Sequence, residues 1–166
     1  KLKEAEVYTR KAIDIKIDYA EAYFNLGNIL KDLGKLQEAE LSTRKAIKIK
    51  PDYAEAYSNL GSILRDLGKL QEAELSTRKA IEIKPDYAEA YSNLGTILGD
   101  LGKLYDAINY YNKAIGLNDN LSNAKSGLIK SKGLICDWSD QETQSIWLEK
   151  LGMKGSAVYP LSLFFL

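Results

Sequence analysis

Few residues of this chain could carry out chemistry, and those few lack the partners that catalysis requires. The sequence has no histidine, so it lacks the commonest general base and the commonest metal ligand. Its single cysteine, Cys136, has no obvious base to activate the thiol. Ser122 and Lys125 match a Ser/Lys catalytic spacing, but nothing else of such a site accompanies them. We therefore expect no catalytic residue, no metal site and no cofactor.

The bulk composition excludes several further function classes. Lys plus Arg and Asp plus Glu are 23 each, so net charge gives no reason to expect nucleic-acid or membrane-surface binding. No apolar run approaches the roughly 20 residues of a membrane-spanning helix. One cysteine cannot form an internal disulfide, which suits a reducing compartment. These features predict a soluble, cytoplasmic protein.

The residues that stand out instead are polar side chains that recur at a fixed interval. A 34-residue unit occupies residues 20–53, 54–87 and 88–121, and residues 1–16 match its second half. The first two units differ only at the pairs Phe24/Ser58, Asn28/Ser62, Lys31/Arg65 and Lys48/Glu82. A period of this length is typical of helical solenoids, in which each unit packs against its neighbours.

Each unit carries signals for two helices. Asp52 with Glu55 has the spacing of a capping box, as do Asp18 with Glu21 and Asp86 with Glu89. Gly34, Gly68 and Gly102 fit the left-handed position that ends a helix, and Pro51 and Pro85 follow the second helix. The expected unit is therefore helix, tight turn, helix, tight turn.

The spacing of the apolar residues resembles the tetratricopeptide repeat. Tyr23, Leu26, Gly27 and Leu30 match the first part of that pattern, and Ala39, Ala46 and Pro51 match the second. Thr43 and Thr77 depart from it where a bulky aromatic is usual, and Tyr111 restores the aromatic in the third unit. The resemblance implies an all-α, right-handed superhelix that ends in capping helices. Gly27 is expected to let two backbones approach closely.

The same resemblance implies that the first helix of each unit lines a concave groove. The groove residues expected from the helical periodicity lie opposite the apolar face; they are Glu21, Phe24, Asn25, Asn28, Asp32, Glu55, Asn59, Ser62, Asp66, Glu89, Asn93, Thr96 and Asp100. Lys31, Ser58, Arg65 and Ser92 share this stripe. Three of the four differences between the first two units fall on it, which indicates either tuning for a ligand or the free drift of solvated positions.

Asn25, Asn59 and Asn93 place one amide in each unit. An asparagine side chain donates and accepts together, so it could bind the backbone of an extended peptide of any sequence. The alternative is that each asparagine only bonds the adjacent helix. Three such hydrogen bonds, at roughly 0.5–1.5 kcal/mol each, fall short of the roughly 8 kcal/mol of micromolar affinity, so binding should be weak.

The charges of the stripe suggest the kind of partner. Family members that hold chaperone C-terminal carboxylates use Lys and Arg in the groove, whereas Glu21, Glu55 and Glu89 occupy that region here. A polar to basic extended segment of a protein is therefore the expected ligand. On the second helices, Val7, Leu41 and Leu75 point away from the apolar side; this row is either a contact surface or ordinary exposed aliphatic residues.

The chain changes character after the third unit. Residues 122–152 are expected to form a helical cap and linker, with a capping box at Ser139 and Glu142, and residues 153–166 an extended tail that leads to a further domain. Cys136 to Asp140, "CDWSD", and Tyr159 to Ser162, "YPLS", are similar to the junction between repeats and catalytic domain in SPINDLY-like and protein O-linked N-acetylglucosamine transferases. Alternatively, Trp138 and Trp147 only anchor a cap.

Two functions are consistent with these features. The first is a protein-interaction scaffold that presents substrates as the N-terminal part of a SPINDLY-like glycosyltransferase, whose catalytic residues are not in this chain. The second is a stand-alone repeat scaffold or adaptor with no attached enzyme. The second helix of an incomplete unit, residues 1–16, and the apolar tail "LSLFFL" are also expected to allow self-association.

Overall fold

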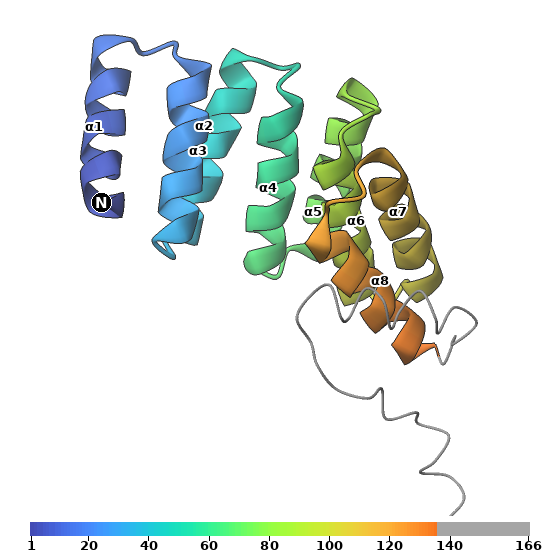
Figure 1. Cartoon of the computed structure of the whole chain (residues 1–166). Helices are drawn as coiled ribbons and strands as arrows, with labels where there is room; N and C mark the ends of the chain where they lie inside the picture. Colours follow the sequence, from blue (N-terminus) through green and yellow to red (C-terminus); the bar gives the residue numbers. More distant parts are fainter. Residues whose placement is uncertain (136–166) are drawn as a thin grey trace, which may run out of the picture.

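The computed structural model describes residues 1–135, which form a row of antiparallel helix pairs without a strand (Figure 1). The helices are α1 (Leu2–Ile15), α2 (Ala20–Asp32), α3 (Leu36–Ile49), α4 (Ala54–Asp66), α5 (Leu70–Ile83), α6 (Ala88–Asp100), α7 (Leu104–Leu117) and α8 (Ser122–Leu134). The all-α prediction is confirmed. The predicted helix after Ser139, the tail, Trp138, Trp147 and the "CDWSD" and "YPLS" motifs lie outside the described residues.

The turn inside each unit follows from a glycine. Gly34, Gly68 and Gly102 adopt φ of 75°, 76° and 76°, the left-handed conformation that other residues rarely reach. The N–H of Lys35 donates to the carbonyl of Leu30 at 2.8 Å, and that of Gly34 to Lys31 at 2.9 Å. These two bonds form a Schellman motif, so this prediction is confirmed.

The capping boxes predicted at Asp18, Asp52 and Asp86 are wrong. The first helices begin at Ala20, Ala54 and Ala88, and the N-cap positions are Tyr19, Tyr53 and Tyr87, none of which makes a side-chain cap bond. Asp52 lies one residue too early because the turn after Pro51 is closed by the backbone: the N–H of Tyr53 donates to Lys50 at 3.2 Å.

The apolar residues pack across units and not only within them. One cluster joins Leu26, Leu30 and Ala39 of the first unit to Ile63 of the second. The next joins Leu60, Leu64 and Ala73 to Ile97 of the third, which repeats the same arrangement one unit later. Each unit thus needs its neighbour to bury its helices, as in a solenoid.

Glycines on the first helices admit side chains from the second. A Cβ placed on Gly27 or Gly61 would collide with the hydroxyl of Thr43 or Thr77, and one on Gly95 would lie 2.8 Å from the ring of Tyr111. Both threonines are fully buried and donate to the carbonyl four residues earlier, at 2.9 Å. The close approach predicted at Gly27 is therefore present, with a hydroxyl in place of the usual aromatic ring.

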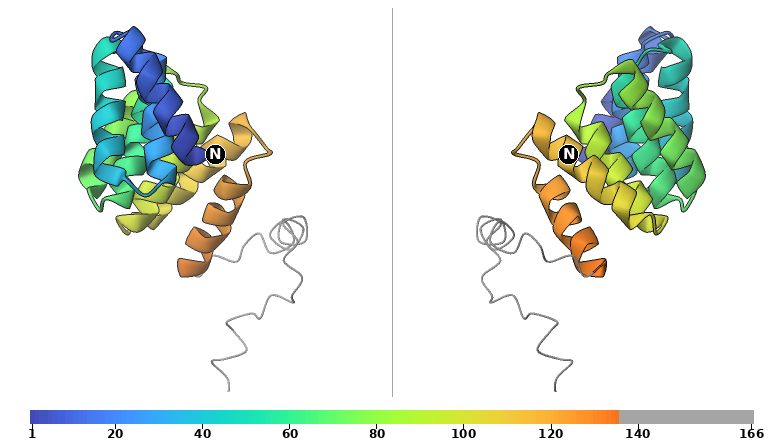
Figure 2. Two further views of the ribbon diagram at one scale, coloured as in Figure 1. Left: turned by 90° about the vertical axis from the view of Figure 1, so that its left-hand side faces the viewer. Right: turned by 90° about the vertical axis from the view of Figure 1, so that its right-hand side faces the viewer.

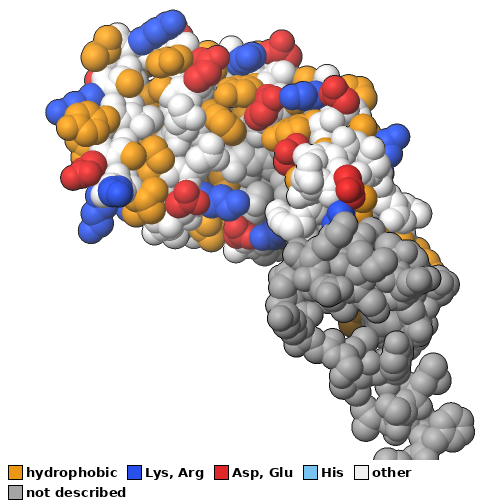
Figure 3. Space-filling view, viewed as in Figure 1, with side chains coloured by type: hydrophobic (Ala, Val, Ile, Leu, Met, Phe, Trp, Pro, Cys, Tyr) orange, Lys and Arg blue, Asp and Glu red, His pale blue; other side chains and the backbone are white. Residues whose placement is uncertain are grey.

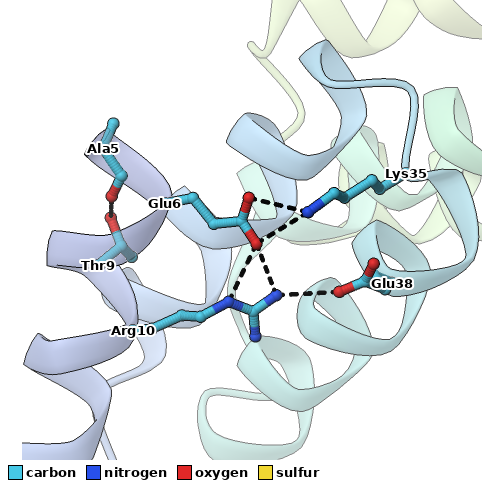
Figure 4. Close-up of polar contacts among 6 residues, drawn as sticks. All are labelled: Ala5, Glu6, Thr9, Arg10, Lys35 and Glu38. Atoms are coloured by element: carbon cyan, nitrogen blue, oxygen red, sulfur yellow. Dashed lines mark hydrogen bonds and ion pairs between the residues drawn. The ribbon is translucent and has the colours of Figure 1, made fainter. Parts of the chain in front are cut away.

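A ladder of ion pairs connects the second helices along the outside of the row. Glu6 accepts from Arg10 one turn later at 2.9 Å and from Lys35 of the next unit at 3.0 Å, and Arg10 also reaches Glu38 at 2.9 Å (Figure 4). The same contacts recur at Glu40 with Arg44 and Lys69, and at Glu74 with Arg78 and Lys103. Ion pairs therefore add to the apolar contacts that hold neighbouring units together.

The row changes at α8. This helix packs on α7 and α6 through Ala124 and Leu128, which are buried with Tyr111. Three positions of each earlier first helix pack against the second helix of the same unit. In α6 they are Tyr91, Gly95 and Leu98, whereas α8 has Lys125, Ile129 and Lys132 there. The side of α8 that corresponds to the Tyr91, Gly95 and Leu98 side of α6 therefore carries two lysines, and its role as a cap stays a prediction.

Candidate peptide-binding groove

The first helices form the inner layer of the curved row. Contacts join α2 to α4, α4 to α6 and α6 to α8, whereas the second helices meet their counterparts mainly through long charged side chains. The tighter spacing of the first helices places them on the concave side, and Figure 2 views the same row along its length from either end. Buried residues such as Ala22, Leu26 and Leu30 face the second helices, so the exposed members of the polar stripe, such as Glu21 and Asn25, lie on the other side.

The three asparagines of that stripe are not equivalent. Asn93 donates its side-chain amide to the hydroxyl of Ser58, on the neighbouring first helix, at 3.0 Å. One unit earlier, the position of Ser58 holds Phe24, and the buried Nδ2 of Asn59 has no hydrogen-bond partner among the described residues. Asn25 is exposed. The bond to an adjacent helix is thus realised at Asn93, and Asn25 is the most accessible amide.

Two residues assigned to the stripe are buried instead. Ser58 and Ser92 are 2% and 5% exposed, because first helices of neighbouring units pack against each other at this position. The equivalent Phe24 is half-buried, and its ring lies 5.0 Å from that of Tyr53. The difference at this position between the first two units therefore changes the contact between helices.

The cations of the stripe are engaged with aspartates near the C-terminal ends of the first helices. Lys31 donates to Ser62 at 2.6 Å and lies 4.0 Å from Asp66. Arg65 pairs with Asp66 at 2.6 Å and lies 3.9 Å from Asp100. Neither cation is left to attract an acidic ligand.

Near the N-terminal ends of the same helices, fewer cations balance the negative charge of the glutamates. Glu55 accepts from Lys84 at 3.1 Å; burial acts to raise its pKa, yet its own backbone N–H and Lys84 hold the pKa of this carboxyl below its usual value. Glu21 and Glu89 form no ion pair within residues 1–135. The groove therefore keeps negative charge at this end.

A tyrosine precedes each of these glutamates. Lysine ammonium groups lie over their rings, 5.3 Å from Tyr19 for Lys16, 4.7 Å from Tyr53 for Lys50 and 5.0 Å from Tyr87. Burial, assisted by the carboxylates of Glu89 and Glu55, raises the pKa of Tyr87 to about 12. The phenol of Tyr87 is therefore a neutral hydrogen-bonding group at the groove edge.

The groove continues onto α8, which the sequence-based assignment missed. A hollow of about 260 Å³ lies between α6, α7 and α8, and among its lining residues are Thr96, Gly99, Asp100, Gly127 and Lys130. Gly99, which stands where earlier units have Lys31 and Arg65, leaves open space here, whereas Gly127, which stands where they have asparagine, admits the ring of Tyr111. The 34-residue register could have identified these positions, since it aligns α8 with α6.

Comparison with models of known protein families identifies the repeat. Tetratricopeptide repeat models match residues 20–53 and 88–121, and two further models of the same repeat match residues 61–102 and 43–74. Together these matches cover residues 20–121 without a gap. The chain belongs to the tetratricopeptide repeat family.

Several solved structures resemble most of this chain. MamA is 25% identical, with a TM-score of 0.78 over 91% of this chain and 89% of that one. MamA residues 41 to the end, from Desulfovibrio magneticus RS-1, is 21% identical, with a TM-score of 0.75 over 95% of this chain and 88% of that one. The first tetratricopeptide repeat domain of Spaghetti (RPAP3), bound to the HSP90 peptide SRMEEVD, is 26% identical. Its TM-score is 0.67 over 70% of this chain and 93% of that one. A search of curated proteins found no match.

Within residues 1–135, no three His, Cys, Asp or Glu side chains are grouped so that they could hold a metal ion. None of the described helices combines the length and the hydropathy that a bilayer crossing needs. On the face shown in Figure 3, cationic, anionic and apolar side chains are intermingled, and no patch of a single charge dominates.

Proposed function

We propose that the concave side of the first helices binds extended segments of other proteins. The observation that carries this proposal is that most apolar residues of the first helices pack within and between units, which leaves polar side chains on the other side of α2, α4 and α6. The repeat domain of Spaghetti, which was solved with a bound peptide, supports the analogy.

The preferred ligand is polar to basic. Lys31 and Arg65 are engaged with Asp66, whereas Glu21, Asp32 and Glu89 take part in no ion pair within residues 1–135. A cationic segment would therefore gain attraction at both ends of the helices, and an acidic one would be repelled.

Fluorescence anisotropy of two labelled 12-residue peptides, one of alternating Ser and Lys and one of alternating Ser and Glu, tests both statements with the full chain. The Lys peptide should bind with an affinity weaker than about 1 µM, and the Glu peptide more weakly still. Asn25→Ala combined with Asn28→Ala should weaken binding several-fold, while Asn112→Ala, on the exposed side of α7, should not. Binding that ignores the groove substitutions would refute the groove; a preference for the Glu peptide would refute the charge assignment.

The finer proposal is that this array presents substrates to a glycosyltransferase of the SPINDLY-like kind, and that the chain itself acts by binding in the cytoplasm without catalysing a reaction. It is supported by the amides on the first helices and by the similarity of "CDWSD" and "YPLS" to that family's junction. The native polypeptide should then be tens of kilodaltons larger than 18.6 kDa and should transfer sugar from a nucleotide donor. A native mass near 18.6 kDa would favour the adaptor.

A further inference from the structure

A second hollow lies on the opposite side of the array from the groove. It has a volume of about 300 Å³ and is bounded by α3, α4 and α5. Its lining residues combine an apolar base with charged edges; they are Arg44, Tyr57, Leu60, Leu64, Glu72, Leu75, Ser76 and Lys79. Leu75, which the sequence places in an exposed aliphatic row, is 70% exposed at its edge.

The third unit shows what this hollow accepts. One unit after Ser76, the chain has Tyr110, and its ring stacks on Tyr91 with centroids 6.2 Å apart and planes inclined by 27°. The Nη1 of Arg78 donates to the Tyr110 hydroxyl at 2.8 Å, and the guanidinium lies 5.5 Å from the ring centroid. A phenol side chain thus occupies, in the third unit, the position that a small serine leaves open in the second.

The groups that hold Tyr110 have counterparts around the open hollow. Tyr57 corresponds to Tyr91, Leu60 and Leu64 to Leu94 and Leu98, and Arg44 to Arg78. Arg44 uses Nε and Nη2 for Glu40 and Glu72, and among the described residues its Nη1 donates no hydrogen bond. The same nitrogen of Arg10 is likewise without a bond in Figure 4. Nη1 of Arg44 could therefore donate a hydrogen bond to a phenol oxygen, as Nη1 of Arg78 does to that of Tyr110.

We propose that the hollow between α3, α4 and α5 binds a tyrosine side chain presented by a partner protein. The partner's ring would stack on Tyr57, its hydroxyl would accept from Nη1 of Arg44, and an adjacent aliphatic residue would contact Leu75. Arg10, Tyr23 and Ser42 hold the same positions one unit earlier. This surface is independent of the groove, so one array could hold two different partners at once.

The experiment is a titration of the full chain, labelled with ¹⁵N, with N-acetyl-L-tyrosinamide at millimolar concentration, followed by NMR. Amide shifts should change around Tyr57, Leu75 and Ser76, and N-acetyl-L-leucinamide should not reproduce them. Ser76→Tyr should abolish the change by filling the hollow from within. Tyr110→Ser should add a second set of changes around Tyr91, because it opens the equivalent hollow.

Two further variants keep the test decisive if Ser76→Tyr does not fold. Leu75→Asp puts a charge in place of an apolar residue that lines the hollow and is 70% exposed, so it should fold and should reduce the tyrosinamide affinity at least several-fold. Arg44→Lys removes the Nη1 donor and should lower that affinity to the level of N-acetyl-L-phenylalaninamide. The proposal is overturned if these variants bind tyrosinamide as the wild type does, if leucinamide gives equal shifts, or if the shifts map to the first-helix stripe.

Discussion

At the scale of single residues, the closest contact between the two helices of a unit depends on the absence of one methyl group. A Cβ on Gly61 would collide with the Thr77 hydroxyl and lie 3.2 Å from the carbonyl oxygen of Ala73. Gly99, in contrast, has no atom within 4 Å of such a Cβ. The two glycines therefore provide matched substitutions in similar helices.

Gly61→Ala should lower the free energy of unfolding by about 1–3 kcal/mol, because the second helix must move outward. Gly99→Ala should raise it by up to about 1 kcal/mol, because alanine favours the helix and meets no obstacle. Urea denaturation followed by circular dichroism measures both. Equal effects of the two substitutions would show that helix propensity, and not the contact with Thr77, governs these positions.

The bond between Asn93 and Ser58 is the second prediction at this scale. Ser58→Ala should lower the free energy of unfolding by about 1–2 kcal/mol, because the amide of Asn93 then has no acceptor in a half-buried site. A double-mutant cycle with Asn93→Ala isolates this pair from the other contacts of Ser58. A coupling energy near zero would mean that water replaces the serine hydroxyl at no cost.

At the scale of elements, the ion-pair ladder joins consecutive second helices. Lys69 donates to Glu40 and Lys103 to Glu74, and these bonds, aided by Arg44 and Arg78 against the opposing effect of burial, hold the pKa of both carboxyls below the usual 4.5. A lowered pKa in the folded state means that the stabilisation is present above pH 4.5 and is lost as the pH falls below it.

The double substitution Glu40→Gln with Glu74→Gln should therefore reduce stability at pH 7 by less than about 1 kcal/mol per site and flatten its decline below pH 4.5. Thermal melts from pH 7 to pH 3 would show both effects. Glu89→Gln is the control, since Glu89 forms no ion pair within residues 1–135. If the double variant lost stability below pH 4.5 as steeply as the wild type, the ladder would be excluded as a source of the pH dependence.

At the scale of the whole molecule, stability is distributed along a row in which each unit contacts mainly its neighbours. Leu128 secures α8 against Tyr111 at one end, and Ile63 joins the first two units in the middle. In such a row, damage at the end should remain local, whereas damage in the middle should divide the array.

Leu128→Ala and Ile63→Ala should each cost about 2–5 kcal/mol locally, since both side chains are buried. Hydrogen exchange of the backbone amides should accelerate only in α7 and α8 for the first variant, and on both sides of α4 for the second. Uniform acceleration in both variants would mean that residues 1–135 unfold as a single cooperative unit.

The amino-acid sequence by itself determined the elements and their order. The 34-residue period, the glycines at the ends of the first helices and the prolines after the second act locally, and a local conformational preference can be deduced from the residues that carry it. The helical periodicity likewise identified the apolar faces, although it assigned the buried Ser58 and Ser92 to the groove stripe. The capping boxes failed because backbone bonds of the turn place the start of the helix at the residue after Tyr53.

Only the tertiary structure decided what each repeated side chain does. Asn59 and Asn93 share the local sequence Tyr-Ser-Asn-Leu-Gly, yet Asn93 donates to Ser58 whereas Nδ2 of Asn59 has no partner among the described residues, because the position of Ser58 holds Phe24 one unit earlier. Ser76 and Tyr110 likewise leave open or fill the space between second helices. In a solenoid the environment of a residue is set by the neighbouring unit, so near-identical repeats acquire different sites through single substitutions one unit away.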